Sequence, residues 1–213
     1  MQSIRLNTEF AETASIHPMA SEFGLRARKK SRTRQTLHDT AVRLFLERGY
    51  DNVTVADVAA EAETAVTTLF KYFPDGKVAL AFAGDEDRAS ALAEAIRTRL
   101  AGTDPLQAVE QFIHARGPFG PRPGISAALA RFIFTTPALR AYARQRWTDC
   151  EVTLAEVLAA EAGRSIDGEQ RALARFILET PDLAAQESEP GAAVAAIFRH
   201  LRAGWPPVSE ADH

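Results

Sequence analysis

The segment 54–73 reads Thr-Val-Ala-Asp-Val-Ala-Ala-Glu-Ala-Glu-Thr-Ala-Val-Thr-Thr-Leu-Phe-Lys-Tyr-Phe and decides the fold. Thr54 and Asp57 have the spacing of a capping box, which predicts the start of a short helix. Residues 61–64 interrupt the apolar pattern, and a second short helix resumes it. The apolar positions of the two helices are Val55, Val58, Ala59, Val66, Leu69, Phe70 and Phe73. Two short amphipathic helices around a tight turn predict a helix-turn-helix motif.

The second of these helices carries polar side chains opposite its apolar stripe. Thr67 and Lys71 lie one turn apart on this face, with Thr68 and Tyr72 beside them. Hydroxyl and amine groups suit hydrogen bonds to base edges and phosphate oxygens. We therefore interpret this face as a DNA-reading surface.

A basic segment precedes the motif. Residues 24–50 contain eight lysines and arginines, against the two acidic residues Asp39 and Glu47. Apolar residues at helical spacing predict a helix over 26–49. Such a helix is placed to neutralise DNA phosphates, and the alternative is an ordinary solvated helix end. The basic residues that precede or open it are Arg26, Arg28, Lys29, Lys30, Arg32 and Arg34.

From about Arg34 to Leu80 the chain resembles the TetR family of bacterial transcriptional regulators. The positions in register are Ala41, Leu44, Phe45, Gly49, Tyr50, Thr54, Val55, Val58, Ala59 and 68–73. The resemblance implies an all-α protein with an N-terminal three-helix head and a C-terminal helical domain for effector binding and dimerisation. With the outward positions above, it predicts DNA contacts from Arg28, Lys29, Lys30, Arg34, Thr54, Val66, Thr67, Thr68, Lys71, Tyr72 and Lys77.

The chain departs from the family pattern in the turn. The family usually has glycine there and serine as the cap of the second helix, where this chain has Glu63 and Ala65. Either Thr64 provides the cap or the turn adopts a different backbone. A non-glycine residue with positive φ costs about 1 kcal/mol, which a packed head can absorb. Phe70 replaces the usual tyrosine, so Tyr72 is the hydroxyl that remains for a phosphate.

The domain organisation follows from the position of the motif. Residues 1–23 show no sustained periodicity and predict a flexible tail. We expect the DNA-binding head to span 24–76 and the effector-binding and dimerisation domain to span 77–213. Asp75 is predicted to cap a fourth helix, where Lys77 is either a phosphate contact implied by the resemblance or a surface lysine.

The remainder of the chain predicts helices and no strand. The fourth helix is long and carries Leu92, Ile96 and Leu100 at four-residue spacing. Proline and glycine clusters separate the later helices. These are expected over 105–116, 124–135, 138–162, 168–187 and 191–203.

Composition excludes several other classes. No apolar run approaches the roughly 20 residues needed to span a bilayer, and the N-terminal segment lacks the apolar core of a signal peptide, so we expect a cytoplasmic protein. Cys150 is the only cysteine, which leaves no intrachain disulfide. The five histidines lack metal-ligand spacing, and no catalytic motif is present. We expect no metal, no cofactor and no enzyme.

Apolar stripes near the end of the chain predict an assembly surface. Two interpretations stand: these side chains pair with a second subunit, as the resemblance implies, or they are buried within one subunit. The resemblance favours a homodimer. The residues expected at its interface are Phe176, Ile177, Val194, Ile197, Phe198 and Leu201.

A set of aromatic and polar residues predicts an effector pocket. They lie on three expected helices that surround the pocket in the family, and the alternative is an ordinary apolar core. An aromatic wall with a few polar groups suits a mostly apolar small molecule of unknown identity. The expected pocket residues are Phe112, Ile113, His114, Phe132, Tyr142, Trp147 and Cys150.

The sequence as a whole predicts a TetR-like regulator of transcription. The resemblance implies a ligand-responsive homodimer that binds a palindromic operator in double-stranded DNA, with repression favoured over activation. A competing hypothesis is a helical enzyme or small-molecule carrier whose head no longer binds DNA. The absence of catalytic spacing argues against the enzyme.

Overall fold

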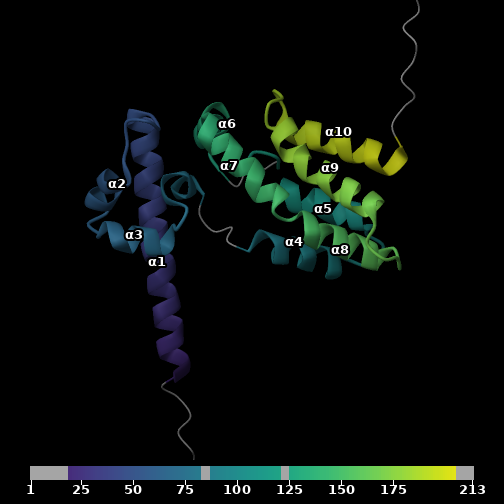
Figure 1. The fold of residues 1–213 in the computed structure, drawn as a ribbon, viewed down its shortest axis with the longest axis horizontal. Coiled ribbons are helices and arrows are strands. Elements are labelled where there is room, and N and C mark those ends of the chain that lie inside the picture. Colours follow the sequence, from purple (N-terminus) through teal and green to yellow (C-terminus); the bar gives the residue numbers. More distant parts are fainter. Residues whose placement is uncertain (1–18, 83–86, 121–124, 205–213) are drawn as a thin grey trace, which may run out of the picture.

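The computed structural model describes residues 19–82, 87–120 and 125–204, with side chains from residue 28 onward. Within these ranges the chain forms helices and turns but no strand, which confirms the all-α class. Figure 1 shows a small head beside a bundle of helices. The elements are α1 (Met19–Arg48), α2 (Val55–Glu61), α3 (Val66–Tyr72), the 3-10 helix η1 (Gly76–Ala81), α4 (Arg88–Arg97), α5 (Pro105–His114), α6 (Ala127–Thr135), α7 (Pro137–Thr148), α8 (Glu151–Glu161), α9 (Gly168–Ala184) and α10 (Pro190–Ala203).

Helix α1 is the longest element and the spine of the head. It starts at Met19, before the expected start at residue 26, so residues 19–23 of the expected tail are helical, while residues 1–18 lie outside the described part of the chain. Leu37, Ala41 and Phe45 are at most 1% exposed, because this face of α1 meets α2, α3 and η1. The expected apolar stripe of the first helix is therefore confirmed.

The helix-turn-helix forms as its local sequence predicts, except at one cap. The Thr54 hydroxyl accepts a hydrogen bond from the Asp57 amide at 3.1 Å, and the Asp57 carboxylate accepts from the Thr54 amide at 2.7 Å. Glu63 holds the turn with φ of 50°, the left-handed conformation expected there. Of the two alternatives for this turn, the Thr64 cap is not formed, because Ala65 occupies the cap position of α3 without a side-chain hydrogen bond.

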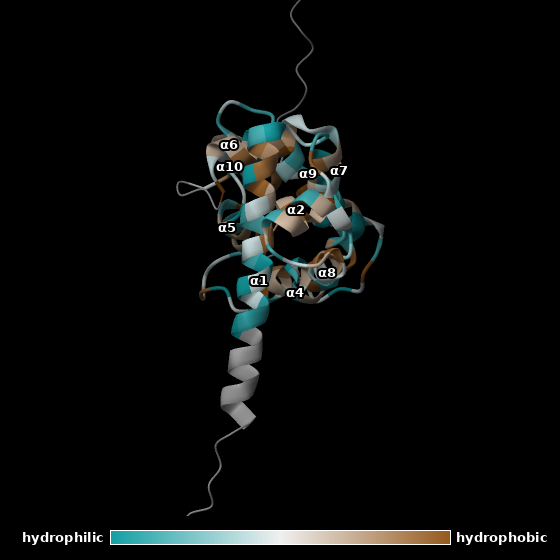
Figure 2. Ribbon diagram, turned by 90° about the vertical axis from the view of Figure 1, so that its left-hand side faces the viewer, coloured by the Kyte–Doolittle hydropathy of each residue, from teal (hydrophilic) through white to brown (hydrophobic). Residues whose placement is uncertain are grey.

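Two apolar clusters form the interior, and the first crosses from the head to the bundle. It joins α1, α2 and α3 to Leu129 and Ile133 of α6 and to Leu139 of α7. The Phe45 ring of α1 stacks on Phe132 of α6, with 6.2 Å between ring centroids. The second cluster fills the bundle. Figure 2 shows apolar residues on the helix faces that turn toward one another.

The expected fourth helix is confirmed only over Arg88–Arg97, where Leu92 and Ile96 are 0% exposed, and its expected start at Asp75 is wrong. Gly76 has φ of 70°, and only the 3-10 helix η1 follows it. Asp75 does not cap this segment, because its carboxylate accepts a hydrogen bond from the Tyr142 hydroxyl at 2.8 Å. Helix α4 begins at Arg88 under an Asp87 cap and ends before Leu100, which is 82% exposed.

The single helix expected over 138–162 is two helices. Asp149 and Cys150 separate α7 from α8, and the Cys150 amide donates to the Trp147 carbonyl, a tighter bond than the α-helical pattern. The break lets α7 and α8 both pack against α9.

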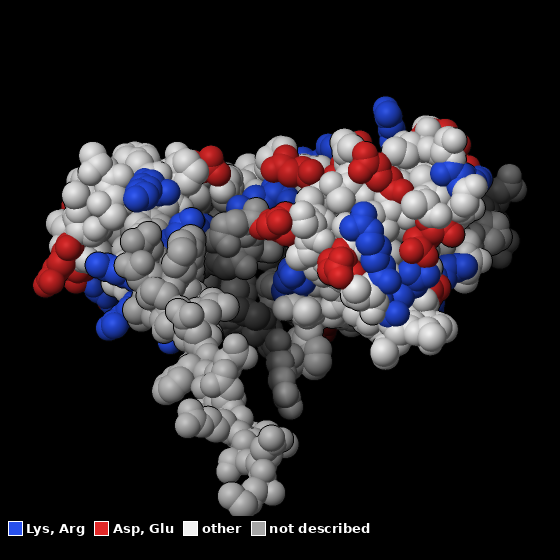
Figure 3. Space-filling model, turned by 90° about the horizontal axis from the view of Figure 1, so that it is seen from below, with Lys and Arg blue, Asp and Glu red and all other residues white. Residues whose placement is uncertain are grey.

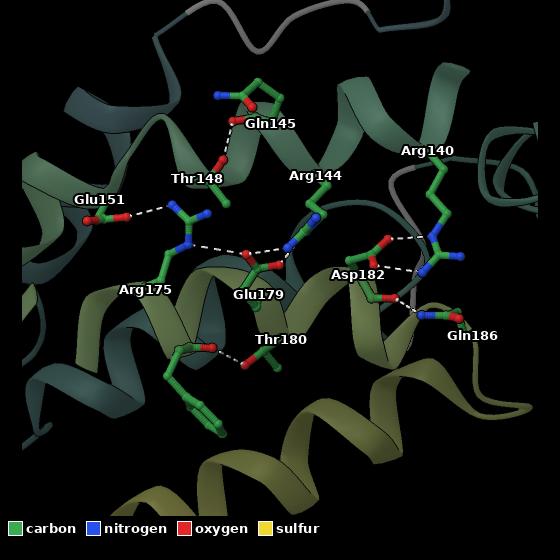
Figure 4. A network of polar contacts seen from close by, with 11 residues as sticks. Arg140, Arg144, Gln145, Thr148, Glu151, Arg175, Glu179, Thr180, Asp182 and Gln186 are labelled. Carbon is green, nitrogen blue, oxygen red and sulfur yellow. Dashed lines mark hydrogen bonds and ion pairs between the residues drawn. The ribbon is translucent and has the colours of Figure 1, made fainter. Parts of the chain in front are cut away.

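Charged side chains join α7 to α9, as Figure 4 shows. Arg140 donates two hydrogen bonds of 2.8 Å to the Asp182 carboxylate, and Arg144 donates two, of 2.6 and 2.9 Å, to Glu179. Arg175 extends the network to Glu151 at 2.8 Å. Bidentate pairs of this kind have a defined geometry, so they fix the register of α7 on α9.

Three residues expected at a subunit interface lie inside the subunit instead. Ile177, Val194 and Phe198 are each 0% exposed in one chain and belong to the bundle core. The physical reason is that α10 packs on α9 and α5 and α9 packs on α8, so the apolar faces of α9 and α10 are covered within one subunit. These three side chains therefore cannot contact a second subunit in this fold.

The ion pairs between α7 and α9 predict an acid-sensitive stability. Arg140 lowers the pKa of Asp182 below its ordinary value of 3.8, and Arg144 lowers the pKa of Glu179 below 4.5. Because both pKa values are depressed in the folded protein, the stabilisation is complete above the ordinary values and is lost as the pH falls through the lowered ones. The melting temperature should therefore fall more between about pH 5 and pH 2 than it does in an Asp182→Asn, Glu179→Gln variant.

Thermal unfolding followed by circular dichroism checks this prediction. Glu156→Gln is the matched control, because Glu156 is exposed on α8, and it should leave the acid dependence of wild type. Parallel curves for wild type and the double variant would contradict the assignment.

Candidate nucleic-acid interface and ligand cavity

Helix α3 presents a polar face to solvent. Thr67 and Lys71 are exposed, Thr68 and Tyr72 are partly buried, and Leu69 on the opposite side is 0% exposed. Val66, at the first turn, is 37% exposed. Hydroxyl and amine groups at the start and end of one short helix can reach a base edge and a phosphate together.

A groove lined by basic residues lies next to the turn that precedes this helix. It has a volume of about 640 Å³ and lies between the middle of α1 and the helix-turn-helix turn. Figure 3 shows several Lys and Arg side chains on the head, at the left, together with a few Asp and Glu side chains, and both signs of charge on the bundle. Lys30 is exposed close by on α1. The groove is lined by Arg28, Lys29, Arg32, Thr33, Thr36, Leu37, Ala62, Glu63 and Thr64.

Arg34 makes contacts within the head that its position among exposed basic residues did not indicate. Its guanidinium lies over the Phe73 ring, 4.3 Å from the ring centroid, and donates to the backbone carbonyl of Tyr72. It thus ties α1 to the end of α3, and its expected DNA contact stays a prediction. Phe70, which the sequence pattern places in the apolar stripe of α3, is 44% exposed.

Thr54 and Lys77 flank the recognition helix in the head. Thr54 is exposed, but its hydroxyl donates to the Asp57 carboxylate at 2.7 Å, and this bond lowers the pKa of Asp57. The Lys77 ammonium lies over the Tyr50 ring, 4.0 Å from the centroid, at the first turn of η1. The stacking restricts the Lys77 side chain, which reduces the entropy that it would lose on binding a phosphate. The single hydroxyl hydrogen of Thr54 is already donated to Asp57, so this hydroxyl would have to give up that bond to donate to a phosphate.

A cavity of about 630 Å³ lies at the seam between head and bundle. Its walls come from α1, η1, α4, the segment after α5, α6 and α7. Most of the walls are apolar or aromatic. The described lining residues are Gln35, His38, Ala81, Phe82, Arg88, Ala115, Arg116, Gly117, Pro118, Phe119, Ile125, Ile133, Phe134, Ala143 and Trp147.

Of the expected pocket residues, Trp147 alone lines this cavity. Tyr142 and Cys150 line a smaller one of about 190 Å³, and Ile113 is 0% exposed in the bundle core. The other three make internal contacts: Phe112 packs edge-on to Trp147, Phe132 stacks on Phe45, and His114 Nδ1 lies 2.6 Å from the Phe119 carbonyl.

Sequence reasoning missed the polar residues of the cavity. Gln35 and His38 lie on the basic first helix, and Arg88 and Arg116 lie at or beyond helix ends. None of these four residues belongs to an apolar stripe, so the hydrophobic periodicity of the sequence did not indicate that they line a cavity. They meet only because the head packs against the bundle.

An exposed polar recognition helix beside a basic helix defines a helix-turn-helix DNA-binding protein. The family model described as "Bacterial regulatory proteins, tetR family" matches residues 37–83. The chain is 34% identical over 175 residues to the HTH-type transcriptional regulator TcmR of Streptomyces glaucescens, and this match covers 78% of the chain and 76% of TcmR. The chain therefore belongs to the TetR family and is a DNA-binding regulator of transcription, not an enzyme.

A solved structure supports the fold. GusR of Salmonella enterica has a TM-score of 0.52 with 17% identity, and the match covers 81% of this chain and 94% of GusR. Among residues 19–82, 87–120 and 125–204, none of the helices combines the length and the hydropathy that crossing a membrane requires.

The exposed face of α3 predicts a loss of operator binding without a loss of folding. Thr67→Ala or Lys71→Ala should weaken specific binding by about 1–3 kcal/mol, because each removes a group that can contact DNA while Leu69 keeps α3 in place. Fluorescence anisotropy with a labelled operator measures the change. Arg97→Ala, which removes an exposed charge from α4, is the control. Wild-type affinity in a folded Thr67→Ala, Lys71→Ala double variant would rule out this surface.

Proposed function

We propose that this regulator is a repressor that responds to a small molecule and binds a palindromic operator as a homodimer. The observation that carries the proposal is the exposed pair Thr67 and Lys71 on α3, beside the basic groove of α1. One head offers a single short recognition helix, so a stable complex needs a second copy on the next turn of DNA, about 34–36 Å away. Two-fold related heads read a two-fold related sequence.

We assign residues 24–76 to DNA binding and 77–213 to effector binding and dimerisation. The two parts are joined by apolar packing and by the hydrogen bond from the Tyr142 hydroxyl to Asp75. This bond and the burial of the ring both raise the pKa of Tyr142, burial being the larger cause. Tyr142 therefore stays protonated as a donor to the head.

A ligand bound in the cavity at the seam would affect operator binding through α1. Gln35 and His38 of α1 form part of its wall, and Arg34, one turn before His38, holds the end of α3. A ligand that displaces α1 would move the recognition helix with it. Because both heads must fit two half-sites at a set spacing, a small rotation of each head lowers operator affinity.

Helices α9 and α10 supply the dimer surface in this proposal. Phe176 is 42% exposed and Leu183 51% exposed on α9, and a shallow groove of about 460 Å³ joins Leu183 to Ala192 and Ile197 of α10. Leu201 lies one turn after Ile197, partly buried. The small side chains of α10 permit close approach of a second helix pair, the arrangement of a four-helix bundle.

Two substitutions of phenylalanine distinguish interface from core. Phe176→Glu should give folded monomers with little operator affinity, because a charge in a desolvated helix interface costs several kcal/mol. Phe198→Glu should unfold the subunit, since Phe198 is 0% exposed. Sedimentation velocity and circular dichroism measure both outcomes. Val152→Glu, at a site 68% exposed on α8, should stay dimeric. A dimeric Phe176→Glu protein would move the interface elsewhere.

Selection of genomic DNA fragments on the full-length protein tests the proposed function as a whole. The expected result is one enriched motif of two inverted half-sites, and a reporter driven through that motif should be silenced by the protein. No enriched motif would favour a small-molecule carrier, and increased reporter expression would identify an activator.

A further inference from the structure

The solvent-facing side of α3 carries two apolar side chains. Val66 is 37% exposed and Phe70 is 44% exposed, whereas Leu69 and Phe73 of the same segment are 0% exposed. Neither Val66 nor Phe70 belongs to the two apolar clusters of the interior. Because an α-helix has about 3.6 residues per turn, side chains four positions apart lie one above the other. Val66 and Phe70 therefore form one apolar strip along the surface of α3.

This strip borders the polar pair Thr67 and Lys71. Each residue of the pair follows a residue of the strip by one position, which places it about 100° further round the helix. The exposed face of α3 is thus apolar along one edge and polar along the other. In the major groove of DNA, hydrogen bonds recognise the donors and acceptors of the bases, and apolar contacts recognise the 5-methyl group of thymine. The two edges of α3 match these two kinds of group.

The Phe70 ring is supported on one side and open on the other. Gly76, at the start of η1, is buried, and a Cβ atom on this residue would lie 3.5 Å from Cε1 of the Phe70 ring. The ring edge therefore lies close to the backbone of Gly76, which restricts its rotation. A side chain that is already restricted loses less conformational entropy when a second molecule covers it.

The charges near the strip indicate what covers it. The groove lined by Arg28, Lys29 and Arg32 borders the turn that precedes α3, and Lys71 is exposed on α3 itself. A basic surrounding of this kind attracts the phosphates of a nucleic acid. The apolar group that a base pair presents in the major groove is the thymine methyl group.

We propose that Val66 and Phe70 determine base specificity by contacting thymine 5-methyl groups in each half-site of the operator. The proposal rests on the proposed function, since it names the base that the recognition helix selects. The rise along the helix between these two positions is about 6 Å, and successive bases of one strand are about 3.4 Å apart. The methyl groups that they contact should therefore lie within about two base steps of each other.

Removal of single methyl groups from DNA tests this proposal without any substitution in the protein. Two random-sequence duplex libraries are copied, one with thymidine triphosphate and one with deoxyuridine triphosphate, because uracil lacks only the methyl group of thymine. The wild-type protein should enrich from the first library a motif with thymine at a fixed position of each half-site.

Duplexes of that motif then measure the contribution of each methyl group. Deoxyuridine at this position should weaken binding about fourfold in one half-site and about 15-fold in both, which is the value of a buried methyl group. Equal affinity for the duplexes with thymine and for every duplex with deoxyuridine would overturn the proposal.

Substitutions then locate the contact. Phe70→Ala should bind the thymine duplex about as weakly as the wild type binds the uracil duplex, and it should no longer distinguish the two. Val66→Ala should do the same at the thymine that Val66 contacts. Leu46→Ala is the matched control, because Leu46 is 43% exposed on α1 of the same head, and this variant should keep the full discrimination. Circular dichroism confirms that each variant is folded.

Two results with these variants would overturn the proposal. One is full discrimination between thymine and uracil in the Phe70→Ala, Val66→Ala double variant. The other is an equal loss of discrimination in Leu46→Ala.

The failure of this proposal is distinguishable from the failure of the proposed function. A palindromic motif bound equally with thymine and with uracil would leave the operator-binding regulator standing and refute the role of Val66 and Phe70. No motif from either library would refute the regulator and the thymine contact together.

Discussion

The packing of α1 against α6 is the interaction on which the rest of the structure depends. Phe45 of α1 is fully buried and stacks on Phe132, so one apolar cluster serves both the DNA-binding head and the bundle. A head joined only by a linker would sample many orientations. Here its orientation is set by side chains of the domain that would bind the effector, which is the physical requirement for coupling two sites.

Polar contacts extend this connection from the head to α9. The Tyr142 hydroxyl on α7 donates a hydrogen bond to the carboxylate of Asp75, which follows the helix-turn-helix in the sequence. Arg140 and Arg144, also on α7, form ion pairs with Asp182 and Glu179 of α9. Helix α7 therefore contacts the head at one end and the proposed dimer helix along its length. A rotation of α7 would change the angle between head and dimer surface, because close-packed elements move as rigid bodies and the ion pairs fix the register of α7 on α9.

The cavity lies on this path, at the seam between the two clusters. A ligand in this cavity would contact both the head and the bundle, so its binding energy would act directly on the orientation of the head. The position also explains why the cavity mixes aromatic walls with arginines: the apolar residues come from faces turned inward, and Arg88 and Arg116 come from helix ends that meet at the seam.

The sequence by itself determined the helix-turn-helix, its Thr54–Asp57 capping box and the exposed polar face of α3, because these depend on residues within a few positions of one another. The sequence did not determine which apolar side chains of α9 and α10 are buried within the subunit. Phe176 and Phe198 look alike in an apolar pattern, and only packing of α10 on α9 and α5 separates an exposed side chain from a core one. The sequence likewise did not indicate that the guanidinium groups of Arg34 and Arg88 stack on aromatic rings. The tertiary structure alone decided these partners, because Phe73 and Trp147 lie far along the chain from the arginines that they contact and meet them only when the helices pack together.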